Sequence, residues 1–131
     1  MVLSDGDIKK AIKSKRIVVT PNPDFSVQLG SCSLDLRLGD TFRIFDYSRY
    51  PYIDPSKKDY SNEITRIIKL KNGEKFIMQP GSFVLAVTLE KVKIAPDLMG
   101  RLEGRSSLGR LGLVVHSTAS IFDPGWDGKP V

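Results

Sequence analysis

Residues 104–128 read GRSSLGRLGLVVHSTASIFDPGWDG and carry more information than any other part of the chain. Arg105 and Arg110 flank a Ser-Ser-Leu-Gly turn. Arginine offers a planar, permanently charged fork, and serine hydroxyls and backbone N–H groups at a tight turn donate hydrogen bonds. These residue types favour binding of a phosphate group, and a short helix opened by Ser106 or Ser107 would point its first N–H groups at the same anion. The alternative is that the serines only cap a helix, with both arginines in solvent.

The second half of this stretch places a carboxylate at a Pro-Gly turn beside an aromatic ring. Such a turn can present Asp123 to a sugar hydroxyl and Trp126 to an apolar face of a ligand. The alternative, which the segment favours in isolation, is an ordinary Asx turn with Trp126 as a core anchor. His116 follows the apolar run 113–115, and a lone histidine on an apolar strand is more often a satisfied core residue than a general base.

Outward from this stretch, short β-strands dominate the predicted structure. Leucine alternates strictly with Asp35 and Arg37 over Ser33–Leu38, which predicts the clearest strand of the chain, ended by Gly39 and Asp40. Asn72-Gly73 predicts a hairpin turn. Further strands are predicted over residues 17–19, 41–45, 64–70, 75–78, 83–89, 92–94 and 98–102. About eight short strands suit a sandwich or a barrel.

One short helix is predicted at the start, where Ser4 and Asp7 resemble a capping box and apolar residues then recur at helical spacing before Arg16. Residues 46–62 have no period and are expected to form a surface excursion. The length of 131 residues, 40% of them apolar, suits one globular domain with a single core.

The bulk composition narrows the partners and the compartment. A net charge of +5 favours an anionic partner without choosing among nucleotide, nucleic acid and membrane surface. A single cysteine, Cys32, cannot form an internal disulfide, and no apolar signal segment follows Met1, so a cytoplasmic location is expected. No apolar run approaches the roughly 20 residues that span a bilayer, so no membrane partner is expected.

The combination of these segments resembles the dCTP deaminase family and its relatives, the trimeric dUTPases. The order GRSSLGRLGL, HSTA and DPGWDG carries the resemblance, and SLDLRLG at residues 33–39 and the strand from Pro80-Gly81 to Leu89 extend it over nearly the whole chain. It implies a mainly β fold, a distorted β-barrel of the dUTPase-like (β-clip) type, with one short N-terminal helix and a short helix after the Arg-Ser-Ser motif. It also implies a single domain over residues 1–131, lacking its C-terminal strands and lid, and homotrimers with active sites between subunits.

The resemblance implies a role for particular residues. Binding of the nucleotide triphosphate, dCTP or dUTP accompanied by Mg²⁺, falls to Arg105, Ser106, Ser107, Leu108, Gly109 and Arg110. Catalytic roles fall to Ser106, which helps to position the attacking water, and to Arg110. Asp123 matches the residue that hydrogen-bonds the deoxyribose, Ala119 lies in the stretch that lines the base, and Val131 joins the substrate-binding set. His116 and Ser117 align beside that stretch. The resemblance implies no protein-held metal site.

The implied reaction is hydrolytic deamination of dCTP to dUTP, in which oxygen from water replaces the amino group at C4 of cytosine and a general base is needed. Zinc deaminases use a His/Cys metal site with a glutamate, and one histidine with one cysteine cannot build it. In the resembled family the base is a glutamate on the strand after the Asp-Pro-Gly turn. We therefore expect it beyond Val131, and expect the chain as it stands to turn over dCTP poorly.

The product and the reaction class stay open. Family members that continue to dUMP and pyrophosphate tend to be apolar near position 121, where this chain has Ile121, which points weakly to a dUMP-forming enzyme. A dUTPase is the first alternative, although HSTA is closer to the deaminases. A non-catalytic nucleotide-binding module is the second, and tyrosines near basic residues would suit nucleic acid: Tyr47, Arg49, Tyr50, Tyr52, Lys57, Lys58 and Tyr60. A mobile surface loop explains these more simply, so no nucleic-acid partner is expected.

Overall fold

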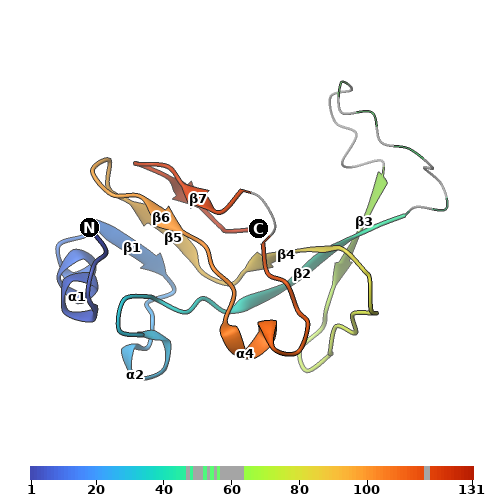
Figure 1. Ribbon diagram of the computed structural model, residues 1–131, viewed down its shortest axis with the longest axis horizontal. Coiled ribbons are helices and arrows are strands. Elements are labelled where there is room, and N and C mark those ends of the chain that lie inside the picture. The colour runs from blue at the N-terminus through green and yellow to red at the C-terminus, as the bar shows by residue number, and fades with distance from the viewer. Residues whose placement is uncertain (47, 49–51, 53, 55, 57–63, 117–118) are drawn as a thin grey trace. The chain divides into compact units, whose positions relative to one another are not determined.

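The computed structural model describes residues 1–46, 48, 52, 54, 56, 64–116 and 119–131 (Figure 1). These residues form two compact units. Unit 1 comprises residues 1–35 and 91–128, and unit 2 comprises residues 36–90 and 129–131. The predicted single domain over residues 1–131 stays a prediction. Of the tyrosine and basic residues named above, only Tyr52 lies within the described residues.

Unit 1 begins with the predicted helix, α1 (Asp5–Lys13). Ser4 is its N-cap: the hydroxyl oxygen accepts a hydrogen bond from Asp7 N at 3.2 Å and donates one to the Asp7 carboxylate at 2.9 Å. Ser4 and Asp7 therefore cap the helix as predicted, although the Asp7 carboxylate accepts from the Ser4 hydroxyl, where a capping box uses the N-cap backbone N–H. Ile8 and Ala11 are buried, as the helical spacing of the apolar residues predicts.

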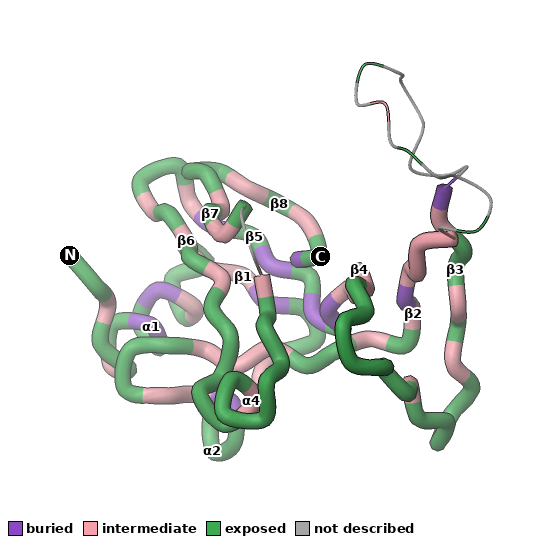
Figure 2. The backbone as a smooth tube through the Cα atoms, turned by 45° about the vertical axis from the view of Figure 1, so that its right-hand side comes forward, coloured by how far each residue is buried: buried purple, intermediate pink, exposed green. Residues whose placement is uncertain are grey.

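The larger sheet of unit 1 is antiparallel, in the order β1-β5-β8. It is formed by β1 (Ile17–Thr20), β5 (Lys91–Ile94) and β8 (Asp127–Gly128). Val19 lies opposite Val92, and both are buried. Figure 2 shows buried backbone segments at β1 and β5 in purple. β1 packs beside α1, so the small core of unit 1 lies between one helix face and one sheet face.

Unit 2 is built on the antiparallel sheet β3-β2-β4, formed by β2 (Leu38–Phe45), β3 (Thr65–Lys69) and β4 (Val84–Thr88). Phe42 in the central strand is buried and stacks on Phe76, with ring centroids 4.3 Å apart. Phe45 and Phe83 form a second, tilted ring pair at 5.5 Å. Aromatic side chains thus cover one sheet and hold a loop against it.

The mainly β prediction is confirmed, but over the described residues the strands form three separate sheets and do not close into a barrel. The turn at Asn72-Gly73 forms, with Gly73 at φ 84°, but β3 pairs with β2 and not with residues 75–78. Residues 75–78 are not a strand, because only Phe76 is anchored there and its neighbours are exposed. Gly39 and Asp40 end no strand: β2 runs through them, with an irregular register between Leu38 and Phe42.

The predicted strand over Ser33–Leu38 is wrong for its first five residues. Only Leu34 has a strand-like partner, in an isolated antiparallel bridge with Leu29, beside which Asp35 N donates to Gln28 O at 2.7 Å. Next in the chain, Asp35 O accepts a hydrogen bond from Gln28 Nε2 at 2.9 Å, and Arg37 N donates to the side-chain carboxylate of Glu90 at 2.8 Å. Side chains supply partners that a neighbouring strand would otherwise supply, so alternation of apolar residues alone misidentified the segment.

None of the helices in the described part of the chain is long and apolar enough to cross a membrane.

Candidate nucleotide-binding site

The Arg-Ser-Ser motif forms a single helical turn in unit 1, α4 (Ser106–Gly109). The helix begins within the motif and not after it. Arg105 is the N-cap residue, in extended conformation, and makes no side-chain capping hydrogen bond; its carbonyl accepts hydrogen bonds from Leu108 N and Gly109 N at 3.0 and 3.1 Å. The serines therefore cap no helix through their side chains at this end, and the first N–H groups of a helical turn have no acceptor within it.

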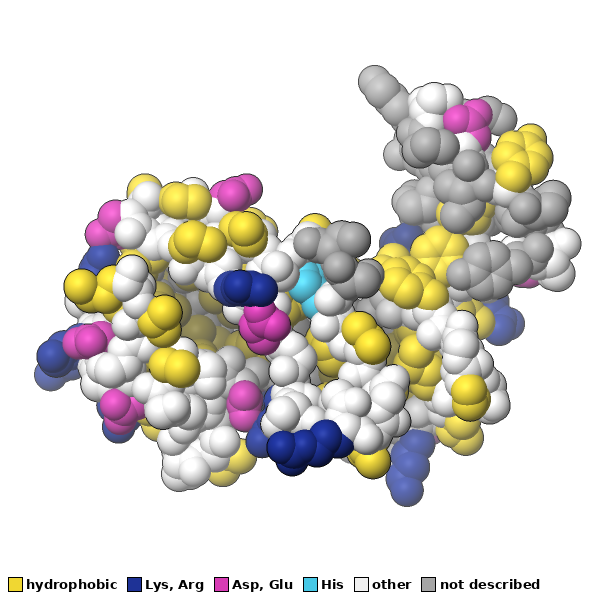
Figure 3. Space-filling model, in the orientation of Figure 1, with side chains coloured by type: hydrophobic (Ala, Val, Ile, Leu, Met, Phe, Trp, Pro, Cys, Tyr) yellow, Lys and Arg dark blue, Asp and Glu magenta, His cyan; other side chains and the backbone are white. Residues whose placement is uncertain are grey.

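The donors of this turn face solvent. Arg105, Ser106, Ser107, Gly109 and Arg110 are exposed, and Leu108 is half-buried. In Figure 3 basic side chains lie at the surface over α4. Leu113 N donates back to Leu108 O at 3.1 Å, and Gly112 takes a positive φ of 81°, so the chain after the turn folds back on it. The helix anchors on Leu108 and leaves its polar residues accessible.

The chain segments before and after α4 lie against each other. A Cβ added at Gly104 would lie 3.0 Å from the Val115 Cβ, so the chain before α4 passes close to the chain after it. β6 (Gly100–Arg101) pairs antiparallel with β7 (Ile121–Phe122), and Leu102 N donates to Ser120 O at 2.8 Å. These bonds tie the strand that leads to Arg105 to the strand that leads to Asp123.

Asp123 begins the Pro-Gly turn, in which Trp126 N donates to Asp123 O at 3.0 Å and Gly125 takes φ 81°. Asp123 is exposed. The Trp126 ring is half-buried and packs against Phe122, with centroids 4.6 Å apart. A Cβ at Gly128 would lie 2.9 Å from the indole. Trp126 therefore anchors the turn, as the alternative interpretation of this segment predicted.

Arg105 has a partner within unit 1 that the sequence did not reveal. Its guanidinium Nη1 lies 3.4 Å from Asp35 Oδ2, and the side chains are 68% and 36% exposed. The pair is accessible, so water screens it and a stronger anion can compete for the guanidinium.

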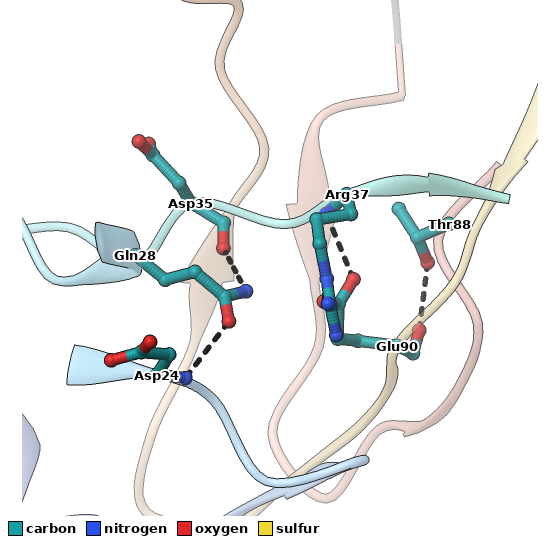
Figure 4. A network of polar contacts seen from close by, with 6 residues as sticks. All are labelled: Asp24, Gln28, Asp35, Arg37, Thr88 and Glu90. Carbon is teal, nitrogen blue, oxygen red and sulfur yellow. Dashed lines mark hydrogen bonds and ion pairs between the residues drawn. The ribbon is translucent and has the colours of Figure 1, made fainter. Parts of the chain in front are cut away.

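Gln28 fixes the position of Asp35. Gln28, 5% exposed, ends the short helix α2 (Phe25–Gln28), whose N-cap is Asp24. Its Nε2 donates to Asp35 O at 2.9 Å and its Oε1 accepts from Asp24 N at 2.9 Å (Figure 4). The Ser26 hydroxyl and N–H donate to the Asp24 carboxylate, and these bonds hold the pKa of Asp24 below its ordinary value of 3.8. An Asp at position 24 with a Ser two residues later is the signal that could have predicted this capped turn.

Arg37, two residues after Asp35 in the chain, forms an ion pair within unit 2. Arg37 Nε donates to Glu90 Oε1 at 2.7 Å, and Arg37 N donates to Glu90 Oε2 at 2.8 Å (Figure 4). The Glu90 side chain is 0% exposed, whereas that of Arg37 is 52% exposed. The Thr88 hydroxyl donates to Glu90 O at 2.8 Å. This pair anchors one carboxylate in the protein interior, and no motif in the sequence marked it.

The remaining predicted residues lie elsewhere. Ala119 and Val131 are exposed, but Val131 belongs to unit 2, and Ser117 lies outside the described residues. His116 is half-buried with φ 75°, and its Nε2 is a buried atom without a hydrogen-bond partner among the described residues. The prediction of a satisfied core histidine on a strand is therefore wrong, because residues 113–116 form no strand and residues 113–115 are exposed.

Among the described residues no group of three or more His, Cys, Asp or Glu side chains could hold a metal ion.

Comparison with solved structures identifies the class of fold. The crystal structure of 2′-deoxycytidine 5′-triphosphate deaminase from Agrobacterium tumefaciens matches 97% of this chain and 39% of that chain, with a TM-score of 0.67 at 20% identity. The short antiparallel sheets and few short helices are thus those of a dUTPase-like fold. The model of the family described as dCTP deaminase-like matches residues 2–131, and this chain belongs to that family.

Curated relatives are considerably more similar in sequence. A Thermomicrobium roseum protein named dCTP deaminase is 56% identical over 128 residues, which cover 98% of this chain and 65% of the relative. A Dictyoglomus turgidum protein named dCTP deaminase, dUMP-forming, is 46% identical over 98% of this chain and 66% of its own length. A protein of the same name from Mycolicibacterium vanbaalenii is 48% identical, with 98% and 65% covered. The chain thus spans slightly less than two thirds of the length of these relatives.

Proposed function

We propose that this chain provides the nucleotide-binding part of an enzyme that hydrolytically deaminates dCTP. The observation that carries the proposal is the 56% identity, over 98% of the chain, to a protein named dCTP deaminase. The exposed arginine–serine turn at α4 supports it, because planar guanidinium groups and hydroxyls are the groups that bind phosphate oxygens.

In this proposal the exposed groups bind different parts of the substrate. Arg105, Arg110 and the two serine hydroxyls hold the triphosphate, and Ser106 also orients the attacking water. Asp123 accepts a hydrogen bond from the deoxyribose, while Ala119 and Val131 contribute to the substrate site. The rigid turn at residues 123–126 supports the role of Asp123, since its aromatic anchor limits the positions that the carboxylate can take.

The product of the proposed reaction is dUTP or, after loss of pyrophosphate, dUMP. Two of the relatives named above, from D. turgidum and M. vanbaalenii, carry the description dUMP-forming, and the T. roseum protein carries the name dCTP deaminase alone. Ile121, exposed on β7 opposite Arg101, is the residue of this chain that favours the dUMP-forming reaction. Release of ammonia with pyrophosphate identifies this version, and release of ammonia alone identifies the other.

Mg²⁺ in this proposal enters with the triphosphate. Mg²⁺ requires octahedral oxygen ligands and keeps several of its waters. Proteins therefore rarely enclose it completely, and substrate phosphates usually supply part of its ligands. When bound it would offset phosphate charge, while the chain's own residues orient the nucleotide. We also propose a cytoplasmic homotrimer that uses no nucleic acid, and light scattering after size exclusion tests the trimer.

Titration calorimetry with dCTP in the presence of Mg²⁺ tests the proposal. Arg105→Ala and Arg110→Ala should each weaken binding at least about 30-fold, because each removes a charge-assisted contact worth roughly 2–3 kcal/mol. Arg16→Ala is the matched control: it removes one exposed arginine that pairs with Asp97, and should leave binding within about twofold.

Two results would contradict this function. Binding of dUTP with none of dCTP would establish the dUTPase alternative, and DNA binding that nucleotides fail to compete would establish a nucleic-acid module. A form extended beyond Val131 through the following strand, assayed beside this chain for ammonia release, tests the expected position of the catalytic glutamate.

A further inference from the structure

We infer that Asp35 is a positioning residue for nucleotide binding, which sets the orientation of the Arg105 guanidinium through a scaffold built by Gln28. This inference rests on the proposed function, because it concerns how the triphosphate-binding arginine is held before the nucleotide arrives. Asp35 lies 70 residues before Arg105 in the chain, and the two meet within unit 1.

The first step is that the Asp35 backbone is held on both sides by one residue. Asp35 N donates to Gln28 O at 2.7 Å, and Asp35 O accepts from Gln28 Nε2 at 2.9 Å. Gln28 is itself buried and fixed at its other amide atom by Asp24 N. Figure 4 shows the Asp35 carboxylate pointing away from this amide. The backbone bonds leave the carboxylate available for a partner outside the scaffold.

The second step is that the partner is Arg105, the residue that begins the α4 turn. Arg105 makes no side-chain capping bond there, and Asp35 Oδ2 lies 3.4 Å from its Nη1. An arginine side chain loses roughly 0.5–1.5 kcal/mol of rotamer freedom when a ligand immobilises it, and a partner that restricts it beforehand reduces that cost. A guanidinium has five N–H donors, so contact of Nη1 with Asp35 leaves others for phosphate oxygens.

The opposing effect is electrostatic, because a carboxylate beside the site also repels a triphosphate. In solvent the repulsion is screened, and Asp35 and Arg105 largely cancel each other's charge at long range. Asp35→Asn separates the two effects, since asparagine keeps the shape and the backbone hydrogen bonds to Gln28 but loses the charge. If positioning dominates, this variant binds more weakly; if repulsion dominates, it binds more tightly.

The experiment measures the dissociation constants of dCTP and of inorganic tripolyphosphate by titration calorimetry, with Mg²⁺ present. Asp35→Asn should weaken both about three- to tenfold, a range that follows from the cost of ordering one arginine. Asp97→Asn is the matched control, since it makes the same change in net charge at an exposed ion pair, with Arg16, and should change binding less than about twofold. Thermal unfolding of each variant checks that the fold is intact.

A double-mutant cycle distinguishes positioning from a general structural role. In an Arg105→Ala background, Asp35→Asn should change binding by less than about twofold, because the residue through which it acts is gone. Equal weakening in both backgrounds overturns the inference, and so does tighter binding by Asp35→Asn alone. A chain that binds dCTP and depends on Arg105, but is indifferent to Asp35, overturns only this inference; an unaltered chain that binds neither probe overturns the proposed function with it.

Discussion

Asp35 and Arg37 lie two residues apart, yet their ion pairs are built in opposite ways. Asp35 meets Arg105 with both side chains partly exposed, whereas Arg37 meets a Glu90 carboxylate that is 0% exposed. Taking a carboxylate out of water costs several kcal/mol, so the buried pair holds only while its hydrogen bonds are kept. An exposed pair gains little stability from its own contact, and the remaining N–H donors of its arginine stay accessible to a ligand. The buried Arg37–Glu90 pair therefore suits a structural anchor, and the exposed Asp35–Arg105 pair suits a binding site.

The largest effect should come from the buried pair. Arg37→Ala removes the guanidinium from a carboxylate that stays buried, and should lower the free energy of unfolding by about 3 kcal/mol. Urea unfolding measures the change. Arg105→Ala breaks the exposed pair and is the matched control, with an expected loss below about 1 kcal/mol. Equal losses from the two substitutions would remove the distinction between them.

An intermediate effect should come from the scaffold behind the exposed pair. Gln28→Ala deprives Asp24 N and Asp35 O of their side-chain partners, and should lower the free energy of unfolding by about 2 kcal/mol. It should also weaken dCTP binding, in the same direction as is expected for Asp35→Asn. Val27→Ala, one residue earlier in α2 and exposed, is the control for both measurements. Weaker binding without loss of stability would show that Gln28 contacts the ligand directly.

The smallest effect concerns the cap of α2. Ser26→Ala removes the hydroxyl donor, which is the main cause of the low pKa of Asp24, so that pKa should rise toward 3.8. A carboxyl group with a lowered folded-state pKa stabilises the fold above its unfolded value and loses this contribution as the pH falls through the folded value. The variant should therefore lose less stability than the parent below pH 3.8. NMR titration of the Asp24 side chain measures the shift, and an unchanged pKa would contradict the assignment.

Sequence patterns predicted the secondary structure correctly where the backbone hydrogen bonds of a segment are made to residues close in sequence or to a regularly paired strand. The Ser4 N-cap with its bonds to Asp7 and the strands at residues 17–19 and 92–94 are cases of this kind. The alternation of apolar residues predicted the wrong structure over Ser33–Arg37. There, backbone groups of Asp35 and Arg37 bond to the side chains of Gln28, which belongs to no strand, and of Glu90, which is distant in sequence. Alternation reports which residues are apolar but not which groups satisfy the backbone.

The candidate site was predictable in its residue types but not in its supports. Two arginines around Ser106 and Ser107 were visible as phosphate-binding chemistry, and the structure leaves them accessible. Asp35 was visible only as a polar residue within an alternating segment, since its pairing with Arg105 depends on tertiary structure. The same holds for Gly104 and Gly128, whose missing side chains matter because Val115 and Trp126 approach them.

The two units are not consecutive in the chain. The backbone leaves unit 1 after Asp35, returns to it at Lys91 and departs again after Gly128, and Pro130 O then accepts a hydrogen bond from Thr88 N at 2.9 Å. Three crossings mean that neither unit corresponds to one uninterrupted stretch of coding sequence. Recombination or domain grafting by simple cut and paste would therefore split both units, and a protein engineer who wants either one alone would need to rejoin its segments with new linkers.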